Sequence, residues 1–196
     1  HYYLMSVRGG YIYHKTGEDA VKIVNSIDSD NIDAYLWAFT GNVADGITIY
    51  NKADGAGVTL FAESSANKTQ IKFGSKEDIS AVEGAITLFN IAYNGDGFAF
   101  SAQNDPTACF NRLGGATAEN LCFWTHANSP KDAGSRITFR ELTADDINNY
   151  AFANCQVLLN TENCVGGYTT AQLANLKAAV EAKNLPAARA AATALE

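Results

Sequence analysis

The chain has 196 residues, of which 47% are hydrophobic and 11% aromatic, enough to bury one full-sized core with room for a small appendage. Its net charge is −7 and its 14 basic residues are scattered, which argues against nucleic acid and anionic membrane surfaces as partners. No apolar run approaches the roughly 18 to 20 residues that cross a bilayer, so we expect no membrane insertion.

The first 142 residues contain twelve strand-like runs that are rich in β-branched and aromatic residues. In chain order these runs are residues 2–7, 10–15, 20–25, 35–40, 47–52, 58–64, 69–74, 85–93, 98–103, 108–113, 120–124 and 136–142. Glycine-rich turns such as Asn94-Gly95-Asp96-Gly97 separate them and supply the positive φ that tight hairpins need.

The runs repeat with a period of about fifty residues. Asp45-Gly46 precedes an alternating apolar run, and Asp96-Gly97 does the same 51 residues later. Such a period indicates supersecondary units that cannot bury their apolar faces alone. Three groups of four strands predict an all-β fold, a β-trefoil of twelve strands in three pseudo-repeats, and a jelly-roll-like sandwich ranks second. We expect the residues that close the repeats to share one core: Trp37, Phe39, Phe89, Ile91, Ile137 and Phe139.

After residue 142 the hydrophobic period changes from 2 to 3.6. Thr143 is placed to cap a helix that carries apolar residues as far as Leu158 on one face. A second helix is expected from Thr169 or Thr170, and Pro186 opens a third, Ala-rich segment. We therefore predict a β-trefoil domain over 1–142 and a short α-helical C-terminal appendage over 143–196. The appendage either links domains or packs on the trefoil or a neighbouring domain of a longer parent chain.

The succession of Asp-Gly turns, each followed by strands that end in an aromatic-rich segment, resembles the ricin-type β-trefoil lectin family. The likeness covers about residues 2–142 and is strongest to trefoil modules appended to secreted glycan-degrading enzymes of gut bacteria. The family's repeat-closing Gln-x-Trp is replaced here by Trp37-x-Phe39, Phe89-x-Ile91 and Ile137-x-Phe139, so the apolar positions survive without the glutamine.

The resemblance implies a sugar site with a polar side chain two residues after a cysteine and an aromatic residue on the following strand. Only the third repeat matches this pattern, because Asn111 stands two residues after Cys109 and Trp124 is the aromatic residue on the following strand. A pyranose needs an aromatic ring for its apolar face and fixed polar groups for its hydroxyls. We expect Trp124 to supply the ring, with the polar partners Asn111, His126, Asn128 and Asp132. The competing interpretation makes Trp124 a core residue and the others ordinary turn residues.

The four cysteines fall into two pairs along the chain. The lectin resemblance implies a disulfide between Cys109 and Cys122, and Cys155 with Cys164 would tie the first helix to the following loop. An even count fits a secreted, oxidised protein, although four buried free thiols would give the same pattern. Neither pair has the short spacing of a zinc site, so we expect no metal.

Catalytic motifs are sparse: no nucleophile elbow, phosphate-binding loop or acid–base pair is recognisable. We expect no enzyme activity and no cofactor. The predicted function is a non-catalytic carbohydrate-binding accessory module of a larger secreted or cell-surface bacterial protein, with a mono- or oligosaccharide and the neighbouring domains of the parent chain as partners. The alternative is a structural or protein-interaction trefoil that has lost sugar binding. The start at His1 rather than Met favours a piece of a longer protein.

Overall fold

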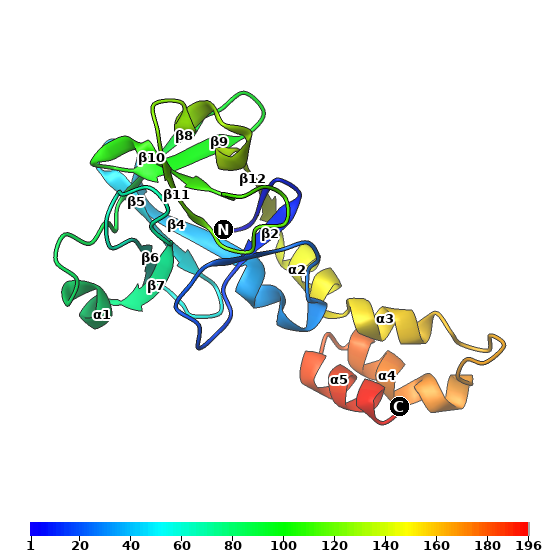
Figure 1. The fold of residues 1–196 in the computed structure, drawn as a ribbon. Helices are drawn as coiled ribbons and strands as arrows, with labels where there is room; N and C mark the ends of the chain where they lie inside the picture. The colour runs from blue at the N-terminus through cyan, green and yellow to red at the C-terminus, as the bar shows by residue number, and fades with distance from the viewer. Residues whose placement is uncertain (196) are drawn as a thin grey trace. The chain divides into compact units, whose positions relative to one another are not determined.

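The structure is a computed structural model that describes residues 1–195 (Figure 1). It contains twelve strands, one for each run that the sequence predicts, which confirms the all-β class and the twelve-strand trefoil. The strands are β1 (Tyr2–Val7), β2 (Gly10–Tyr13), β3 (Lys22–Val24), β4 (Leu36–Asn42), β5 (Gly46–Asn51), β6 (Val58–Phe61), β7 (Lys72–Ser75), β8 (Phe89–Tyr93), β9 (Phe98–Ala102), β10 (Asp105–Asn111), β11 (Cys122–Thr125) and β12 (Ile137–Leu142).

Six of these strands close into a barrel. The first and fourth strands of each repeat pair with one another, as β1 with β4, β5 with β8 and β9 with β12. Successive repeats join through β4 with β5 and β8 with β9, and β12 returns to β1. The two middle strands of each repeat form a hairpin, which gives β2–β3, β6–β7 and β10–β11.

The three hairpins meet in a ring of backbone hydrogen bonds. The N–H of Val21 donates to the carbonyl of Ile71 at 3.0 Å, Ile71 to Leu121 at 3.0 Å, and Leu121 back to Val21 at 3.3 Å. These residues are spaced by fifty, lie just before β3, β7 and β11, and are fully buried. The ring marks the pseudo-threefold axis that the sequence period predicts.

One hydrophobic core fills the barrel, and the repeat-closing residues belong to it as expected. Trp37, Phe89 and Ile137 are fully buried, and Phe39, Ile91 and Phe139 are partly buried against them. The indole Nε1 of Trp37 donates to the carbonyl of Ile12 at 2.9 Å, so this large ring satisfies its one polar group inside the core.

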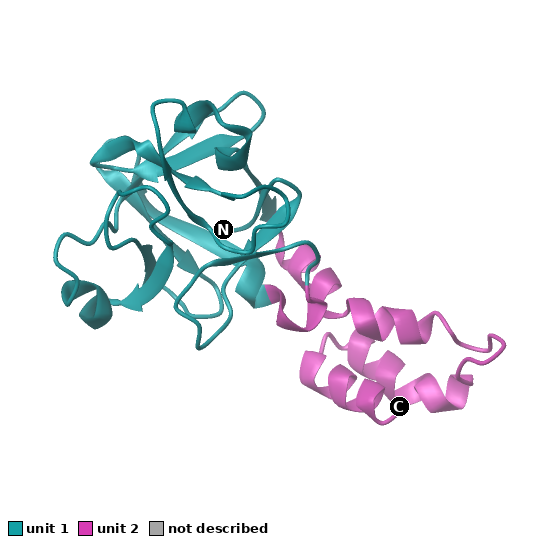
Figure 2. Cartoon of the chain, viewed as in Figure 1, with its two compact units in different colours: residues 1–27, 33–141 teal, residues 28–32, 142–196 magenta. Residues whose placement is uncertain are grey.

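The helices form a second compact unit (Figure 2). It comprises residues 28–32 and 142–196, whereas the trefoil unit comprises residues 1–27 and 33–141. Its helices are α2 (Ala144–Ala151), α3 (Ala153–Leu159), α4 (Thr170–Glu181) and α5 (Leu185–Thr193). Residues 28–32 include the start of the 3₁₀ helix η1 (Ser29–Tyr35), where the carbonyl of Asp30 accepts a 2.6 Å hydrogen bond from Arg189 of α5.

The helical unit has its own small core, which contains Phe152, Cys155, Leu173 and Leu176. Capping boxes at Thr143 and Thr169 start α2 and α4, as the sequence indicates. The expected continuous first helix is instead interrupted at Phe152, which lies between α2 and α3 with its side chain buried in this core. Within residues 1–195, no helix combines the length and the apolar character that crossing a bilayer requires.

A short helix in the trefoil unit was not predicted from the sequence. It is α1 (Lys76–Ser80), which follows β7. Ser75 caps it, because the Ser75 side chain accepts from the Asp78 N–H while the Asp78 carboxylate accepts from the Ser75 N–H. Its five residues bury no side chain, so it carries no apolar periodicity that would reveal it.

Candidate functional site

The candidate site lies on the β10–β11 hairpin of the third repeat. In its register Cys109 faces Trp124, and Asn111 faces Cys122. Successive side chains of a strand point to opposite faces. The intervening Phe110 and Phe123 enter the core, so Cys109, Asn111, Cys122 and Trp124 share the other side, which we call the outer face.

The connection from β11 to β12 folds back over β10. It contains the 3₁₀ helices η2 (Ser129–Lys131) and η3 (Ala133–Ser135). Ser129 Oγ donates to the carbonyl of Thr107 at 2.7 Å, and the Arg112 N–H donates to the carbonyl of Gly134 at 2.9 Å. This connection covers the Asn111 end of the outer face and leaves Trp124 half-buried.

Trp124 and His126 form a pair of stacked rings. Their centroids are 5.3 Å apart and their planes differ by 7°. His126 is exposed, and its Nδ1 accepts a 3.1 Å hydrogen bond from the N–H of Asn128, whose side chain is also exposed. The two rings and the Asn128 backbone N–H are therefore held next to each other.

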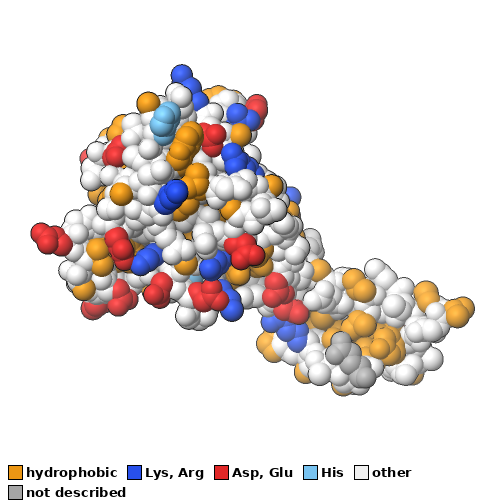
Figure 3. Space-filling model, in the orientation of Figure 1, with side chains coloured by type: hydrophobic (Ala, Val, Ile, Leu, Met, Phe, Trp, Pro, Cys, Tyr) orange, Lys and Arg blue, Asp and Glu red, His pale blue; other side chains and the backbone are white. Residues whose placement is uncertain are grey.

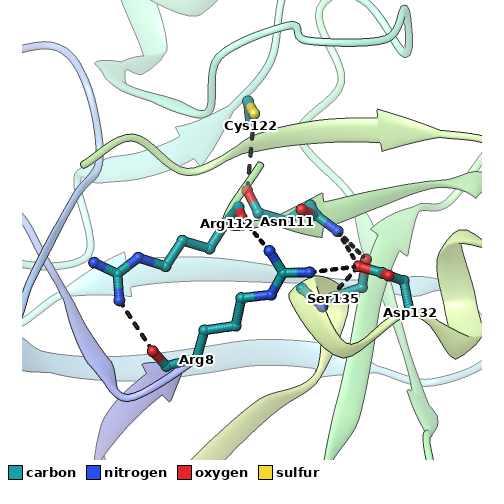
Figure 4. A network of polar contacts seen from close by, with 7 residues as sticks. Arg8, Asn111, Arg112, Cys122, Asp132 and Ser135 are labelled. Carbon is teal, nitrogen blue, oxygen red and sulfur yellow. Dashed lines mark hydrogen bonds and ion pairs between the residues drawn. The ribbon is translucent and has the colours of Figure 1, made fainter. Parts of the chain in front are cut away.

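Asn111 is buried, with 1% of its surface exposed. Its Nδ2 donates to Asp132 Oδ2 and to Ser135 Oγ, both at 2.9 Å (Figure 4). The same Asp132 oxygen accepts a 2.6 Å hydrogen bond from the N–H of Gly134. Both amide protons of Asn111 are thus used internally, and the residue fixes the half-buried Asp132 carboxylate.

Two arginines complete this network (Figure 4). Arg8 Nη2 lies 3.5 Å from Asp132 Oδ2. The Arg112 side chain is 1% exposed and donates only to neutral acceptors, namely the carbonyls of Arg8 and Ala118 and Oδ1 of Asn25. Burial, together with the nearby positive charge of Arg8, lowers the pKa of Arg112 below its ordinary value.

Close packing constrains the network as well. A Cβ atom on Gly134 would lie 2.7 Å from both Asn111 Oδ1 and Asp132 Oδ2, so only glycine fits between these two side chains. Sequence reasoning missed Arg8, Arg112 and Gly134. Arg112 directly follows Asn111 at the end of β10, and a charged residue at that place was the available signal.

The five predicted site residues therefore form two groups. Trp124, His126 and Asn128 are linked at the surface, and the buried Asn111 is linked to Asp132 of the covering connection. Trp124 and Asn111 are diagonal neighbours across the hairpin, a relation that places such residues about 7 to 8 Å apart. Whether these residues bind a ligand remains a prediction.

The other two repeats do not offer the same groups. In the equivalent registers, Tyr13 and Phe61 take the place of Asn111, and Val24 and Gly74 take the place of Trp124. The third repeat is thus the one in which an aromatic ring and an amide share the outer face, as the sequence indicates.

The structure does not contain the two disulfides that were predicted. All four cysteines, which lie within residues 1–195, carry free thiols. Cys109 and Cys122 are diagonal rather than directly opposite, and the roughly 7 to 8 Å of a diagonal pair exceeds the 4.4 to 6.8 Å that a disulfide usually spans. Their sulfurs instead donate to separate carbonyls, those of Pro106 and Asn111.

The second pair is also unbridged. Cys155 is buried in the helical core, whereas Cys164 lies exposed in the loop after α3 and its Sγ donates to the carbonyl of Asn160. One sulfur is buried in the core and the other lies at the surface, so the two form no disulfide although they are close along the chain. Among residues 1–195, no group of three or more His, Cys, Asp and Glu side chains is arranged to hold a metal ion.

Solved structures with the same fold include several lectins. The Rhizoctonia solani agglutinin matches with a TM-score of 0.56 at 12% identity, over 72% of this chain and 94% of its own. The Macrolepiota procera ricin B-like lectin, solved in complex with lactose, matches with a TM-score of 0.54 at 12% identity, over 72% and 96%.

A larger enzyme chain also contains a similar unit. The endo-β-galactosidase from Clostridium perfringens that releases GlcNAcα1-4Gal matches with a TM-score of 0.56 at 15% identity, over 72% of this chain but 32% of its own. No protein-family model and no curated protein matches the sequence. Since identities this low carry information about the fold alone, the comparisons show that the chain resembles the ricin-type β-trefoil lectin modules in its architecture.

Proposed function

We propose that the chain is a non-catalytic carbohydrate-binding module and that its site is the outer face of the third repeat. The observation that carries the proposal is the half-exposed Trp124 ring, stacked on the exposed His126. A half-buried indole offers a flat apolar surface that is already fixed in place, and the C–H face of a pyranose packs on such a surface.

Polar groups for sugar hydroxyls lie close to this ring. The Asn128 side chain is exposed two residues after His126, and the Asp132 carboxylate is oriented by Asn111 and Gly134, with 26% of its side chain exposed. In this arrangement Asn111 positions Asp132 and does not itself contact the sugar. The sequence, in contrast, led us to expect that Asn111 contacts the sugar directly.

We further propose an accessory role in a larger secreted or cell-surface bacterial protein. The support is the Clostridium enzyme, in which the matching region forms about a third of a longer chain. One stacking ring and two or three hydrogen bonds leave a free energy of about −4 kcal/mol, a dissociation constant of about 1 mM. Weak binding of this kind suits a tethered module, because linkage raises the effective concentration.

The test is an NMR titration of the wild type and of Trp124→Ala against a panel of mono- and disaccharides. The proposal expects shift changes around β10 and β11 in the wild type and none in the variant. Tyr93→Ala is the matched control, since Tyr93 is an exposed aromatic residue elsewhere on the trefoil unit. This control should bind as the wild type does, and both variants should keep the wild-type far-UV spectrum.

The second candidate is a structural or protein-interaction trefoil without sugar binding. The observation in its favour is the burial of Asn111, whose amide protons are both used inside the protein. This alternative expects no shift with any sugar of the panel. It also expects Trp124→Ala to lower stability by the several kcal/mol typical of a core aromatic residue.

A further inference from the structure

The loop from β6 to β7 of the second repeat lies against β11 beside the proposed site. The N–H of Lys68 donates to the carbonyl of Phe123 at 2.8 Å. Thr125 is tied to the same loop, because its N–H donates to Asn67 Oδ1 at 3.3 Å and its Oγ1 donates to the carbonyl of Ser65 at 2.5 Å. These bonds flank Trp124 on both sides, so the Lys68 backbone is fixed next to it.

The positive charge of Lys68 affects Cys122, a residue of the outer face. Burial raises the pKa of the Cys122 thiol, and the positive charge of Lys68 opposes part of that rise. Cys122 is two residues from Trp124 on the same face. Lys68 is exposed, and among residues 1–195 no carboxylate forms an ion pair with it.

The other charged side chains near this face have partners within the protein. Arg8 pairs with Asp132, whereas the buried Arg112 meets only neutral acceptors. Asp105 approaches from the Cys109 side, where burial raises the pKa of Cys109 to about 12 with a further contribution from Asp105. Arg8 is thus matched by Asp132, whereas the Lys68 ammonium has no carboxylate partner among residues 1–195. Figure 3 shows a histidine beside hydrophobic side chains on the trefoil unit, with basic and acidic side chains on the same face.

We infer that the ligand is an acidic saccharide, in which a carboxylate or sulfate group pairs with Lys68 while the sugar ring stacks on Trp124. This inference rests on the proposed carbohydrate-binding function and adds the chemical class of the sugar. Lys68 carries an unpaired ammonium on a backbone that is fixed next to the stacking ring, so it gains an ion pair from an anionic sugar and none from a neutral one. The acidic surface elsewhere disfavours long polyanions, so a single anionic sugar residue fits better than a highly charged polymer.

The experiment uses matched sets of methyl glycosides. Methyl galactoside, its uronic acid and its 6-sulfate differ only at C6, and the glucose series repeats the comparison. NMR titrations at low salt should show the anionic members binding about two- to fivefold more tightly than the neutral one, the range of an exposed ion pair. Added salt should shrink the difference, because it screens exposed charges.

Variants connect the difference to Lys68. Lys68→Gln should bring the anionic ligands to the affinity of the neutral one, and Lys68→Arg should keep most of the difference. Lys76→Gln is the matched control, since Lys76 is an exposed lysine of α1 in the same unit. It should behave as the wild type.

The outcomes separate this inference from the function on which it rests. If neutral sugars bind as tightly as anionic ones, or if Lys68→Gln keeps the difference, the acidic ligand is wrong while the carbohydrate function stands. If no sugar binds, both are wrong. Tighter binding of the uronic acid than of the sulfate assigns the charged group to a carboxylate, and the reverse order assigns it to a sulfate.

Discussion

Replacement of Asn111 by alanine should destabilise the trefoil unit. The substitution removes one hydrogen bond to a carboxylate and one to a hydroxyl, both at 2.9 Å in a buried place. Bonds to charged groups contribute about 1.5 to 3 kcal/mol and neutral ones about 0.5 to 1.5 kcal/mol. The free energy of unfolding should therefore fall by about 2 to 4 kcal/mol, a large part of the 5 to 15 kcal/mol typical of a domain.

Urea denaturation followed by tryptophan fluorescence measures this change. Both tryptophans, Trp37 and Trp124, lie in the trefoil unit, so the signal reports on that unit. With a urea slope of about 2 kcal/mol per molar, the midpoint should fall by roughly 1 to 2 M. Asn128→Ala is the control, because this exposed side chain should change stability by less than about 0.5 kcal/mol.

A second variant tests the direction of the hydrogen bond. Asn111→Asp keeps the shape but places a second carboxylate against Asp132, so the variant should be least stable at neutral pH and recover as the solution is acidified. The reasoning would be refuted by an Asn111→Ala protein as stable as the Asn128→Ala control that no longer binds sugar. Asn111 would then contact the ligand directly.

Two further predictions concern thiols and acid stability. In the native protein one thiol, that of the exposed Cys164, should react quickly with a thiol reagent, and four should react after denaturation without reductant; two or fewer in the denatured protein would show that disulfides form. Hydrogen bonds from Thr107 hold the pKa of Asp105 below its ordinary value, so its stabilising effect is present above the unfolded-state pKa of about 3.9 and is lost as the pH falls through the lower folded-state pKa. The urea midpoint of the wild type should therefore exceed that of Asp105→Ala by the largest amount near pH 6, and this difference should shrink as the pH falls below about 4. A difference that does not change with pH would contradict this cause.

The repeat period and the alternation of apolar residues were sufficient to predict the fold. Each predicted run overlaps one strand, although the boundaries of several strands differ from those of the runs. The run at 85–93, for example, becomes a strand only from Phe89, because Ile86 bonds back to Ala62 through both backbone groups. The interruption at Phe152 was hidden for a related reason, since the helical apolar pattern continues across it.

The site could be predicted only in part. The lectin resemblance indicated Asn111 and Trp124, and both lie on one hairpin, where the register places them on the same face. Burial of Asn111 depends on the connection that folds over β10, and no periodicity reports such a fold-back. Lys68 comes from a different repeat, and its place beside β11 arises from the threefold arrangement of the hairpins.

The hydrogen-bond ring of Val21, Ile71 and Leu121 makes the three repeats a single cooperative unit. Its bonds join residues that are fifty and one hundred positions apart, so the entropy of closing long loops must be overcome before any of them forms. Two repeats alone would leave a buried donor and a buried acceptor unpaired. The stability of a solenoid is the sum of contributions from neighbouring repeats and so grows with each one added. Here the third hairpin completes the bonding of the other two, which opposes any intermediate in which only part of the trefoil is folded.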